Sequence, residues 1–399
     1  MANRQGTGGM VFAASVLTVL ALGALAYKFV PSFHQAFNDF YGLSSVPTNH
    51  TLAITNSENT NPSVDSGSTL PGTKAPNFTL TDQFGRRVSL SDFRGKVIIM
   101  AFVDSTCTNI CPLTTASMLA AVRQLGVAAA DVQLLGINAN PISTSVADVR
   151  AYSVAHGLMN HWLFLTGSKK QLSPVWQAYH MYSGIVHGAI DHTAGLFIID
   201  QKGRERKLYL TQMSYAGTAA QGQILANEVA SLLPKGTVNL HKSVQLPPLT
   251  PTLPESLLSV NGKNGGSTVQ GQSVQVANKA HLLVFFGTWL TPASAARSSL
   301  LALNQYETDA KKHGWPQPLL VDEVATEGSP NALKTYLSAM PTLHYPAVLD
   351  VTGETADAVT AQDIPWLALV SSSGKVLYAH DGFLPLKTLE QQVAKHVHA

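Results

Sequence analysis

The sequence predicts an α/β protein that contains one fold twice in tandem, each copy with a central mixed sheet flanked by helices. The chain has 399 residues, more than one ordinary hydrophobic core serves, so two domains are expected. Apolar, β-branched runs alternate with helical segments, as in βαβ units with parallel strands. The segment from Lys279 to Leu290 also repeats the pattern of the segment from Lys96 to Cys107.

The first domain is predicted to span residues 70–235. Its runs Val97–Val103 and Val132–Ile137 have the continuous apolar character of strands that are buried on both faces of a sheet. Between them, residues 113–125 predict a helix that Gly126 closes, so the two strands should be parallel. The remaining predicted elements are a strand–turn–strand unit around Asp82–Gly85, helices that begin at the capping boxes of Ser145 and Ser168, a buried strand over Leu196–Asp200 and a last helix over Gln221–Leu233.

The second domain, residues 255–399, is predicted to have the same fold without the chemistry of the first. The aligned positions are Cys107 with Leu290, Cys111 with Ala293 after one gap, and Leu196–Gly203 with Leu367–Gly374. The order and type of the elements are preserved in this alignment. Clustered prolines predict a semi-stiff linker over residues 236–254 between the domains.

The N-terminal part is predicted to direct the chain to a membrane. Met10–Ala26 is a run of apolar or small residues at the lower length limit for a membrane-spanning helix. Its end, Ala24-Leu25-Ala26, also fits a signal-peptide cleavage site. Residues 1–41 are therefore either a retained anchor with a juxtamembrane segment or a cleaved signal, and residues 42–69 are predicted to be a flexible tether. Both alternatives place the remaining chain outside the cytoplasm, at the outer face of the cell membrane.

The composition excludes several classes of function. Charged residues make up 13% of the chain and the net charge is +2. No block of basic residues is present, so a nucleic acid is not an expected partner. Two cysteines in the whole chain exclude a disulfide-rich scaffold. Both lie in one motif, Cys107-Thr-Asn-Ile-Cys111-Pro112, and the lack of other thiols suits an oxidising compartment.

This motif can form a disulfide, exchange one, or hold a soft metal ion. Pro112 suits the first turn of a helix, where the helix dipole should lower the pKa of Cys111 and favour its thiolate. His192 is a candidate third ligand, because it lies in a loop that directly precedes a buried strand and can approach the cysteines. The alternative is a surface or capping residue, the more common role of a lone histidine before a strand. Two thiolates and one imidazole suit Cu(I), whereas a structural zinc site normally has four protein ligands. A structural disulfide stays an alternative, although the repeat keeps this turn without cysteine. The polar neighbours interpreted as having no metal-binding role are His180, His187 and Asp104.

Together these motifs resemble the SCO/SenC family, membrane-anchored, thioredoxin-like proteins that deliver copper to the binuclear copper centre of cytochrome c oxidase. The residues that carry the resemblance are Cys107–Pro112, Ile190-Asp191-His192-Thr193 and Phe197–Gly203, within a similar region of residues 72–234. The resemblance implies copper binding by Cys107, Cys111 and His192, and a redox-active disulfide between the two cysteines. It also implies three partners: the copper-centre subunit of the oxidase, another copper chaperone, and a thiol–disulfide reductant.

The second domain is similar to thioredoxin-like domains of the TlpA/ResA type. Phe286-Gly-Thr-Trp289 stands where those domains have their aromatic lead-in to Cys-x-x-Cys, and Ile364-Pro365 resembles their cis-proline. Without thiols this domain cannot exchange disulfides. Docking or structural extension is therefore its expected role.

The leading interpretation is a membrane-tethered copper metallochaperone that uses a copper ion. The alternative is a thiol–disulfide reductant that keeps the copper-site cysteines of a target reduced, which requires Cys107 and Cys111 but not His192. A third interpretation, based on the cysteine-free second domain, is a scaffold. The motif defines no enzymatic activity beyond thiol–disulfide exchange.

Overall fold

The computed structural model describes residues 61–397, apart from 235–236, 239–242, 261–270 and 330. It contains two helix-covered sheets, which we call the N-terminal module (residues 61–234) and the C-terminal module (residues 256–397). Apart from Ser68–Pro71, the described residues of both modules belong to one compact unit. The predicted membrane segment, Met10–Ala26, lies outside the described residues, and the exact domain boundaries stay a prediction.

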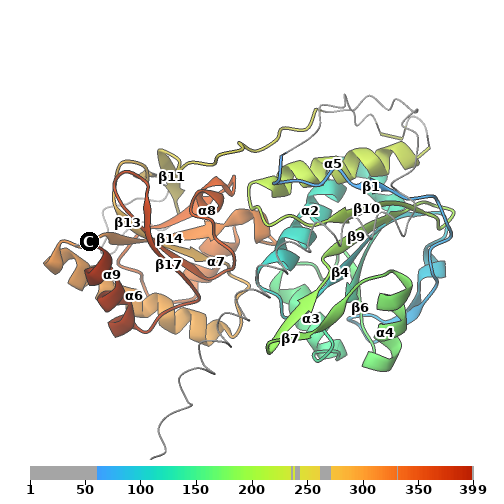
Figure 1. Ribbon diagram of the computed structural model, residues 1–399, viewed down its shortest axis with the longest axis horizontal. Helices are drawn as coiled ribbons and strands as arrows, with labels where there is room; N and C mark the ends of the chain where they lie inside the picture. Colours follow the sequence, from blue (N-terminus) through green and yellow to red (C-terminus); the bar gives the residue numbers. More distant parts are fainter. Residues whose placement is uncertain (1–60, 235–236, 239–242, 261–270, 330, 398–399) are drawn as a thin grey trace, which may run out of the picture. The chain divides into compact units, whose positions relative to one another are not determined.

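The N-terminal module is built around a mixed sheet. Its elements are β1 (Ser68–Thr69), β2 (Thr79–Thr81), β3 (Arg87–Ser89), η2 (Leu90–Phe93), β4 (Val97–Val103), α2 (Ile110–Leu125), η3 (Gly126–Asp131), β5 (Val132–Asn138), α3 (Val146–Ala155), β6 (Leu163–Leu165), α4 (Lys169–Ala178), β7 (Ser183–Val186), β8 (Ala189–His192), β9 (Gly195–Ile199), β10 (Glu205–Leu210) and α5 (Gly217–Leu232). The strands lie in the order β10-β9-β4-β5-β6 (Figure 1). β4 is parallel to β5 and antiparallel to β9. The predicted βαβ unit is confirmed.

Every residue of β4 is buried, because the two faces of this strand pack against different helices. Val97 and Ile99 belong to a cluster with residues of α2 and α5, two helices that lie side by side (Figure 1). On the opposite face, Phe102 packs on Tyr179, directly after α4, with ring centroids 5.7 Å apart. Tyr179 also contacts Phe197 of β9 at 5.2 Å. Helices thus cover both faces of the sheet, which confirms the predicted thioredoxin-like α/β layers.

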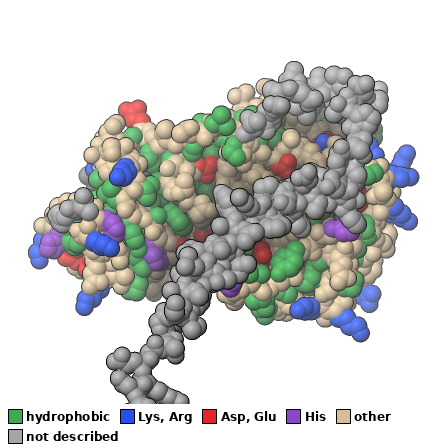
Figure 2. All heavy atoms as spheres, viewed as in Figure 1, with side chains coloured by type: hydrophobic (Ala, Val, Ile, Leu, Met, Phe, Trp, Pro, Cys, Tyr) green, Lys and Arg blue, Asp and Glu red, His purple; other side chains and the backbone are tan. Residues whose placement is uncertain are grey.

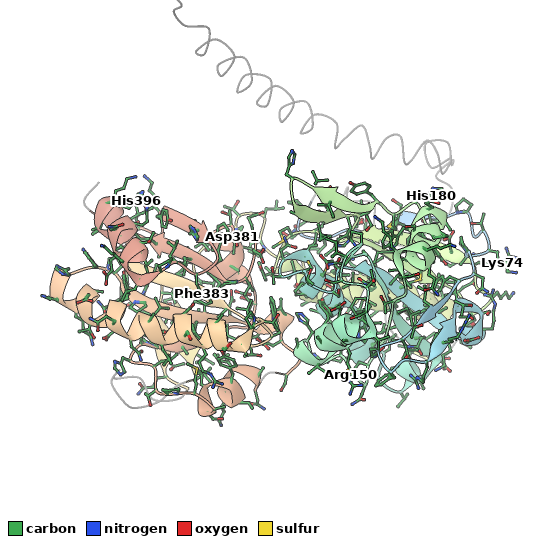
Figure 3. The ribbon with its side chains drawn as sticks, turned by 90° about the horizontal axis from the view of Figure 1, so that it is seen from below. Lys74, Arg150, His180, Asp381, Phe383 and His396 are labelled. Atoms are coloured by element: carbon green, nitrogen blue, oxygen red, sulfur yellow. The ribbon has the colours of Figure 1, made fainter. Side chains whose placement is uncertain are left out.

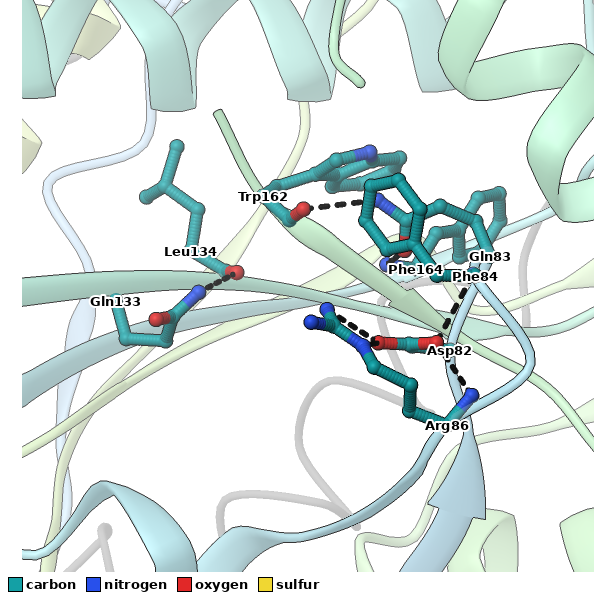
Figure 4. A network of polar contacts seen from close by, with 8 residues as sticks. All are labelled: Asp82, Gln83, Phe84, Arg86, Gln133, Leu134, Trp162 and Phe164. Carbon is teal, nitrogen blue, oxygen red and sulfur yellow. Dashed lines mark hydrogen bonds and ion pairs between the residues drawn. The ribbon is translucent and has the colours of Figure 1, made fainter. Parts of the chain in front are cut away.

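The β2–β3 hairpin closes on a buried carboxylate (Figure 4). Asp82 is fully buried, accepts the backbone N–H of Arg86 at 2.9 Å and pairs with the guanidinium of the same residue at 2.7 Å. The neighbouring side chain of Gln83 donates to the carbonyl of Trp162 at 2.9 Å and accepts from the N–H of Phe164 at 2.8 Å. The predicted strand–turn–strand unit is therefore confirmed, and it is fastened to β6 by a side chain.

Residues 61–67 are ordered, which corrects the end of the tether predicted over residues 42–69. Val64 is buried. The carboxylate of Asp65 accepts the backbone N–H of Leu210 at 2.6 Å, and Gln221 donates to the carbonyl of Asp65 at 3.0 Å. Hydrogen bonds of polar side chains hold this segment, so its low apolar content did not indicate flexibility. The last two residues of the predicted tether form β1 (Ser68–Thr69), and residues 42–60 lie outside the described residues.

One helical stretch of the described chain, Ile110–Asp131, is long and apolar enough to cross a membrane. It comprises α2 and η3, and 56% of its most apolar stretch of 18 residues is buried inside the protein. Residues of α2 pack directly against β4. We therefore interpret this stretch as the core helix of the N-terminal module.

The C-terminal module repeats the order of the first. Its elements are β11 (Ser256–Ser259), β12 (Ser273–Gln275), β13 (His281–Phe286), α6 (Ala293–His313), β14 (Gln317–Glu323), η4 (Val324–Thr326), α7 (Ala332–Ser338), β15 (Ala347–Asp350), α8 (Glu354–Ala358), β16 (Trp366–Val370), β17 (Val376–Asp381) and α9 (Leu386–Val397). β13 is parallel to β14 and antiparallel to β16, as β4 is to β5 and β9. The predicted internal repeat is confirmed, and the peptide bond before Pro365 is cis as expected.

Charged side chains are sparse on the surface that Figure 2 shows. The Lys and Arg side chains lie apart from one another, among hydrophobic and uncharged polar groups. This distribution agrees with the small net charge of +2. On this face, a polyanion therefore meets no continuous basic surface.

Candidate metal centre

The two cysteines lie at the turn between β4 and α2. Asn109 is the N-cap residue of α2, and its side chain accepts the backbone N–H of Ile110 at 2.6 Å. Cys111 and Pro112 therefore occupy the first helical turn, as predicted. Cys107 precedes the helix, in the turn itself.

The two thiols differ in exposure and in hydrogen bonding. Both are free, with Cys107 half-buried and Cys111 fully buried. The backbone N–H of Cys111 donates to Sγ of Cys107 at 3.3 Å, and the backbone N–H of Asp104 donates to Sγ of Cys111 at 3.4 Å. In its protonated form, the Cys107 thiol donates to Oδ1 of Asn109 at 3.0 Å. The start of α2 thus orients the sulfur of Cys107, whereas the backbone directly after β4 orients the sulfur of Cys111.

The activated thiol is Cys107, which corrects the prediction for Cys111. Its hydrogen bond with the Cys111 thiol, followed by weaker hydrogen bonds that oppose the effect of burial, lowers the pKa of Cys107 to about 6. Burial, followed by the hydrogen bond with Cys107 and the charges of Cys107 and Asp104, raises the pKa of Cys111 well above its ordinary value. The helix start acts on the half-buried sulfur, because the N–H of Cys111 points at Cys107 rather than at its own thiol.

His192 approaches the cysteines from the end of strand β8, which corrects its predicted position in a loop. β8 pairs with β7 in an antiparallel hairpin. Nε2 of His192 lies 3.5 Å from Sγ of Cys111, and Nδ1 lies 3.2 Å from the carbonyl of Thr193. Because a carbonyl only accepts, Nδ1 carries a proton, and in the neutral ring the lone pair of Nε2 faces the sulfur. Burial acts to lower the pKa of His192, but the hydrogen bond and the charge of Cys107 outweigh it and raise the pKa.

The distance between the Cys111 sulfur and the His192 nitrogen suits two ligands of one small, soft metal ion. With bonds of about 2.3 Å to sulfur and 2.0 Å to nitrogen, a planar three-coordinate ion separates the two ligand atoms by about 3.7 Å. The observed distance between Sγ of Cys111 and Nε2 of His192 is 3.5 Å. Within the described residues, no three His, Cys, Asp or Glu side chains are already in a metal-binding arrangement. In this structure the three groups are hydrogen bonded instead, so an ion has to replace these bonds with small movements of the sulfurs.

A polar network behind the thiols was not predicted from the sequence. Asp104 is buried, and its carboxylate accepts from the backbone N–H of Thr106 at 2.8 Å and from Nδ2 of Asn140 at 2.6 Å. Asn140 follows β5, the strand parallel to β4. Its position at the same edge of the sheet was the available signal. Asp104 therefore caps the loop that carries the cysteines, and its charge also raises the pKa of Cys111.

Two other histidines near the motif in sequence lie at the surface. His180 follows α4 and is exposed (Figure 3). His187 is exposed at the tip of the β7–β8 hairpin. By contrast, Nε2 of His192 lies 3.5 Å from Sγ of Cys111. The interpretation of His180 and His187 as residues without a metal-binding role agrees with these positions.

We expect the two thiols to be alkylated with very different pH profiles. Only the thiolate reacts, and the pKa of Cys107 is about 6, so its reaction with iodoacetamide should be half-maximal near pH 6. Cys111 should stay unmodified at this pH because burial protects it and raises its pKa. Peptide mass spectrometry after timed alkylation measures both sites. In a Cys111→Ala variant the profile of Cys107 should move toward higher pH, and equal profiles for both wild-type thiols would contradict this asymmetry.

Comparison with known proteins shows which family and which relatives the N-terminal module is similar to. Residues 67–225 match the SCO1/SenC family. The SCO1 protein homolog of Bacillus subtilis (strain 168) is 25% identical over 139 residues, which cover 33% of this chain and 71% of that protein. A protein of Mycobacterium tuberculosis assigned as a peroxiredoxin is 33% identical over 138 residues, covering 34% of this chain and 80% of that protein.

A solved structure is also similar to part of the chain. The copper-bound structure of Bradyrhizobium japonicum ScoI is 23% identical, covers 40% of this chain and 100% of that chain, and has a TM-score of 0.34. The Cys107–Cys111 turn and His192 lie inside the region that matches the family. By this family match, residues 67–225 form an SCO1/SenC domain that contains every residue of the candidate site.

Proposed function

We propose that this protein is a copper metallochaperone that binds one copper ion through Cys107, Cys111 and His192. The observation that carries the proposal is the approach of Nε2 of His192 to within 3.5 Å of Sγ of Cys111. A thiol pair alone serves disulfide exchange equally well. The imidazole supplies the third soft or borderline ligand that Cu(I) accepts.

Protons have to leave this site before copper binds, because the ligands are thiolates and a neutral imidazole. Cys107 is a thiolate near neutral pH, since its pKa is about 6. Burial raises the pKa of Cys111, so copper has to displace the proton of this thiol. The pKa of His192 is also raised, so a proton competes with copper at Nε2 as the pH falls. Copper affinity should therefore increase with pH. Half-buried Cys107 is the ligand through which a partner reaches the ion.

The direct test is the copper stoichiometry of the fully reduced protein. After anaerobic reduction we expect one Cu(I) per chain, measured by competition with a chromophoric Cu(I) chelator. His192→Ala should weaken binding by about 10- to 100-fold or more, because loss of even an outer partner of a metal ligand costs that much. His187→Ala, which removes an exposed histidine from the same hairpin, is the matched control and should bind normally. Equal affinity of both variants would overturn the proposed ligand set.

The alternative is thiol–disulfide exchange, which the lowered pKa of half-buried Cys107 favours. The Cys107 thiolate would attack a target disulfide, forming a mixed disulfide and releasing one target thiolate. The Cys111 thiolate, after losing its proton, would then attack Cys107, releasing the second target thiol and leaving a Cys107–Cys111 disulfide. Two electrons pass to the target. His192→Ala that keeps full function in oxidase assembly would favour this alternative over copper delivery.

The SCO1/SenC domain supports a proposal for the partners and the location. We propose delivery to the copper centre of cytochrome c oxidase, at the outer face of a membrane to which Met10–Ala26 tethers the chain. The coupling of copper binding to reduced thiols also requires a thiol–disulfide reductant as partner. Membrane extraction of the full chain, with and without residues 1–41, tests the tether separately from copper binding.

A further inference from the structure

A carboxylate of the C-terminal module holds the turn that leads into helix α5. Asp357 of α8 accepts the backbone N–H of Tyr215 at 2.8 Å, the backbone N–H of Ala216 at 3.2 Å and the hydroxyl of Ser214 at 2.6 Å. The hydroxyl of Ser214 in turn accepts the backbone N–H of Gly217, the first residue of α5, at 3.0 Å. A carboxylate at this point satisfies N–H groups before the helix and complements the helix dipole. The start of α5 is therefore held by a residue of the C-terminal module, 141 to 143 positions further along the chain.

Helix α5 in turn packs along the helix that carries Cys111. The hydroxyl of Ser117 in α2 donates to the carbonyl of Thr218 in α5 at 3.3 Å. A Cβ added to Gly222 of α5 would lie 2.6 Å from Cβ of Ala120 in α2. The helices thus approach too closely for a side chain at this position. A shift of α5 is therefore transmitted to α2.

The C-terminal module also packs directly against residues beside the cysteines. Leu113, two positions after Cys111, and Tyr215, before α5, belong to the buried cluster of the C-terminal module. Each is 1% exposed. Leu290, the counterpart of Cys107 in the repeat, belongs to the same cluster and is also buried. Where the first module has a thiol, the second has an apolar side chain in this shared core.

A third contact fixes the end of helix α3. The ring of His156, the C-cap residue of α3, lies against Trp289 with centroids 4.7 Å apart, and against Tyr152 of α3 at 4.2 Å. Burial lowers the pKa of His156 to about 3, so the ring stays neutral between its neighbours. The hydroxyl of Thr115 in α2 lies 3.5 Å from that of Tyr152. Trp289 of the C-terminal module is thus linked, through His156 and Tyr152, to the helix that carries Cys111.

We infer that the cysteine-free module is a positioning domain for the metal centre, in which Asp357 holds α5 and, through it, the cysteine helix α2. In its own strand-to-helix turn, an apolar side chain, Leu290, packs in the core at the position of a redox-active thiol. Asp357 touches neither thiol nor His192 in the structure; it is a positioning residue. The effect on copper rests on the proposed function, whereas the effect on the helices does not.

The test compares Asp357→Ala with Glu354→Ala in the full-length chain. Both substitutions remove an acidic side chain from the first turn of α8, but Glu354 makes none of the three hydrogen bonds that Asp357 makes. In copper-free protein, Asp357→Ala should raise amide hydrogen exchange about fivefold in residues 214–220, an effect comparable to the loss of a helix cap. It should also raise exchange in residues 107–115 by about two- to fivefold. With copper bound, the release of Cu(I) to a chelator should accelerate by a similar factor.

A milder variant keeps the test informative if Asp357→Ala folds poorly. Asp357→Asn keeps a side-chain oxygen that accepts a hydrogen bond but removes the charge, and should show the same pattern with smaller amplitude. An increase confined to residues 214–220, with unchanged exchange in residues 107–115, would overturn the positioning role. Equal effects of Asp357→Ala and Glu354→Ala would do the same. Because exchange is measured without copper, it tests this inference even if the protein binds no copper.

Discussion

Cys111→Ser should abolish tight copper binding, with a loss of affinity of more than about 100-fold, since even outer partners of metal ligands are worth 10- to 100-fold. The side chain of Cys111 is buried, with its sulfur 3.5 Å from Nε2 of His192 and within reach of the backbone N–H of Asp104 at 3.4 Å. A serine oxygen is a hard, neutral ligand in a position that needs a soft thiolate. Competition titration with a Cu(I) chelator after anaerobic reduction measures the loss.

The matched control removes a sulfur from the same helix. Met118 is buried in α2, and a thioether is the other soft sulfur ligand that a protein offers to Cu(I). Met118→Leu should bind copper like the wild type, since it conserves volume and leaves the thiol pair intact. If Met118→Leu lost as much affinity as Cys111→Ser, or if Cys111→Ser kept tight binding while folded by circular dichroism, the assigned ligand set would be wrong.

The elements that could be predicted are those with a strong local signal. The apolar run at Val97–Val103 and the capping boxes at Ser145 and Ser168 each specify structure within a few residues. The alignment of β13 with β4 transferred this information to the C-terminal module. These predictions are confirmed because the local pattern and the global fold agree.

The predictions that failed depended on contacts between distant residues. Asp65 holds its segment through hydrogen bonds with Leu210 and Gln221. These residues lie far away in the sequence, so the local composition gives no sign of them. The reversal between the two thiols arises because the N–H of Cys111 points at Cys107, a detail of turn geometry rather than of spacing. His192 was assigned to a loop because its strand is only four residues long and partly exposed. The motif and the topology predicted that His192 approaches Cys111. Only the structure gives the distance between Nε2 and Sγ.

The contact between Asp357 and the turn before α5 shows the same limit. The hydroxyl of Ser214 caps Gly217 locally, but Ser214 is itself held by Asp357, and no local pattern indicates this distant partner. The helix begins at Gly217, one turn before the predicted start at Gln221.

Tyr215→Ala should destabilise the protein by about 3–5 kcal/mol, the usual result of deleting a buried aromatic ring. Tyr215 precedes α5 of the N-terminal module, yet its ring is 1% exposed within the core cluster of the C-terminal module. The substitution therefore removes apolar packing from the contact that holds the two modules together. Urea unfolding followed by tryptophan fluorescence measures the change in the free energy of unfolding.

Tyr215→Phe separates the ring from its hydroxyl. The hydroxyl is buried and has no hydrogen-bond partner among the described residues, and burial raises the pKa of Tyr215, so the group stays neutral. A buried, unpaired hydroxyl is unfavourable, so the phenylalanine variant should be at least as stable as the wild type. Tyr182→Ala, at an exposed site of the N-terminal module, should change the stability by less than about 0.5 kcal/mol. A phenylalanine variant as unstable as Tyr215→Ala would show that the hydroxyl, not the packed ring, joins the modules, and the positioning role would then need a polar rather than an apolar basis.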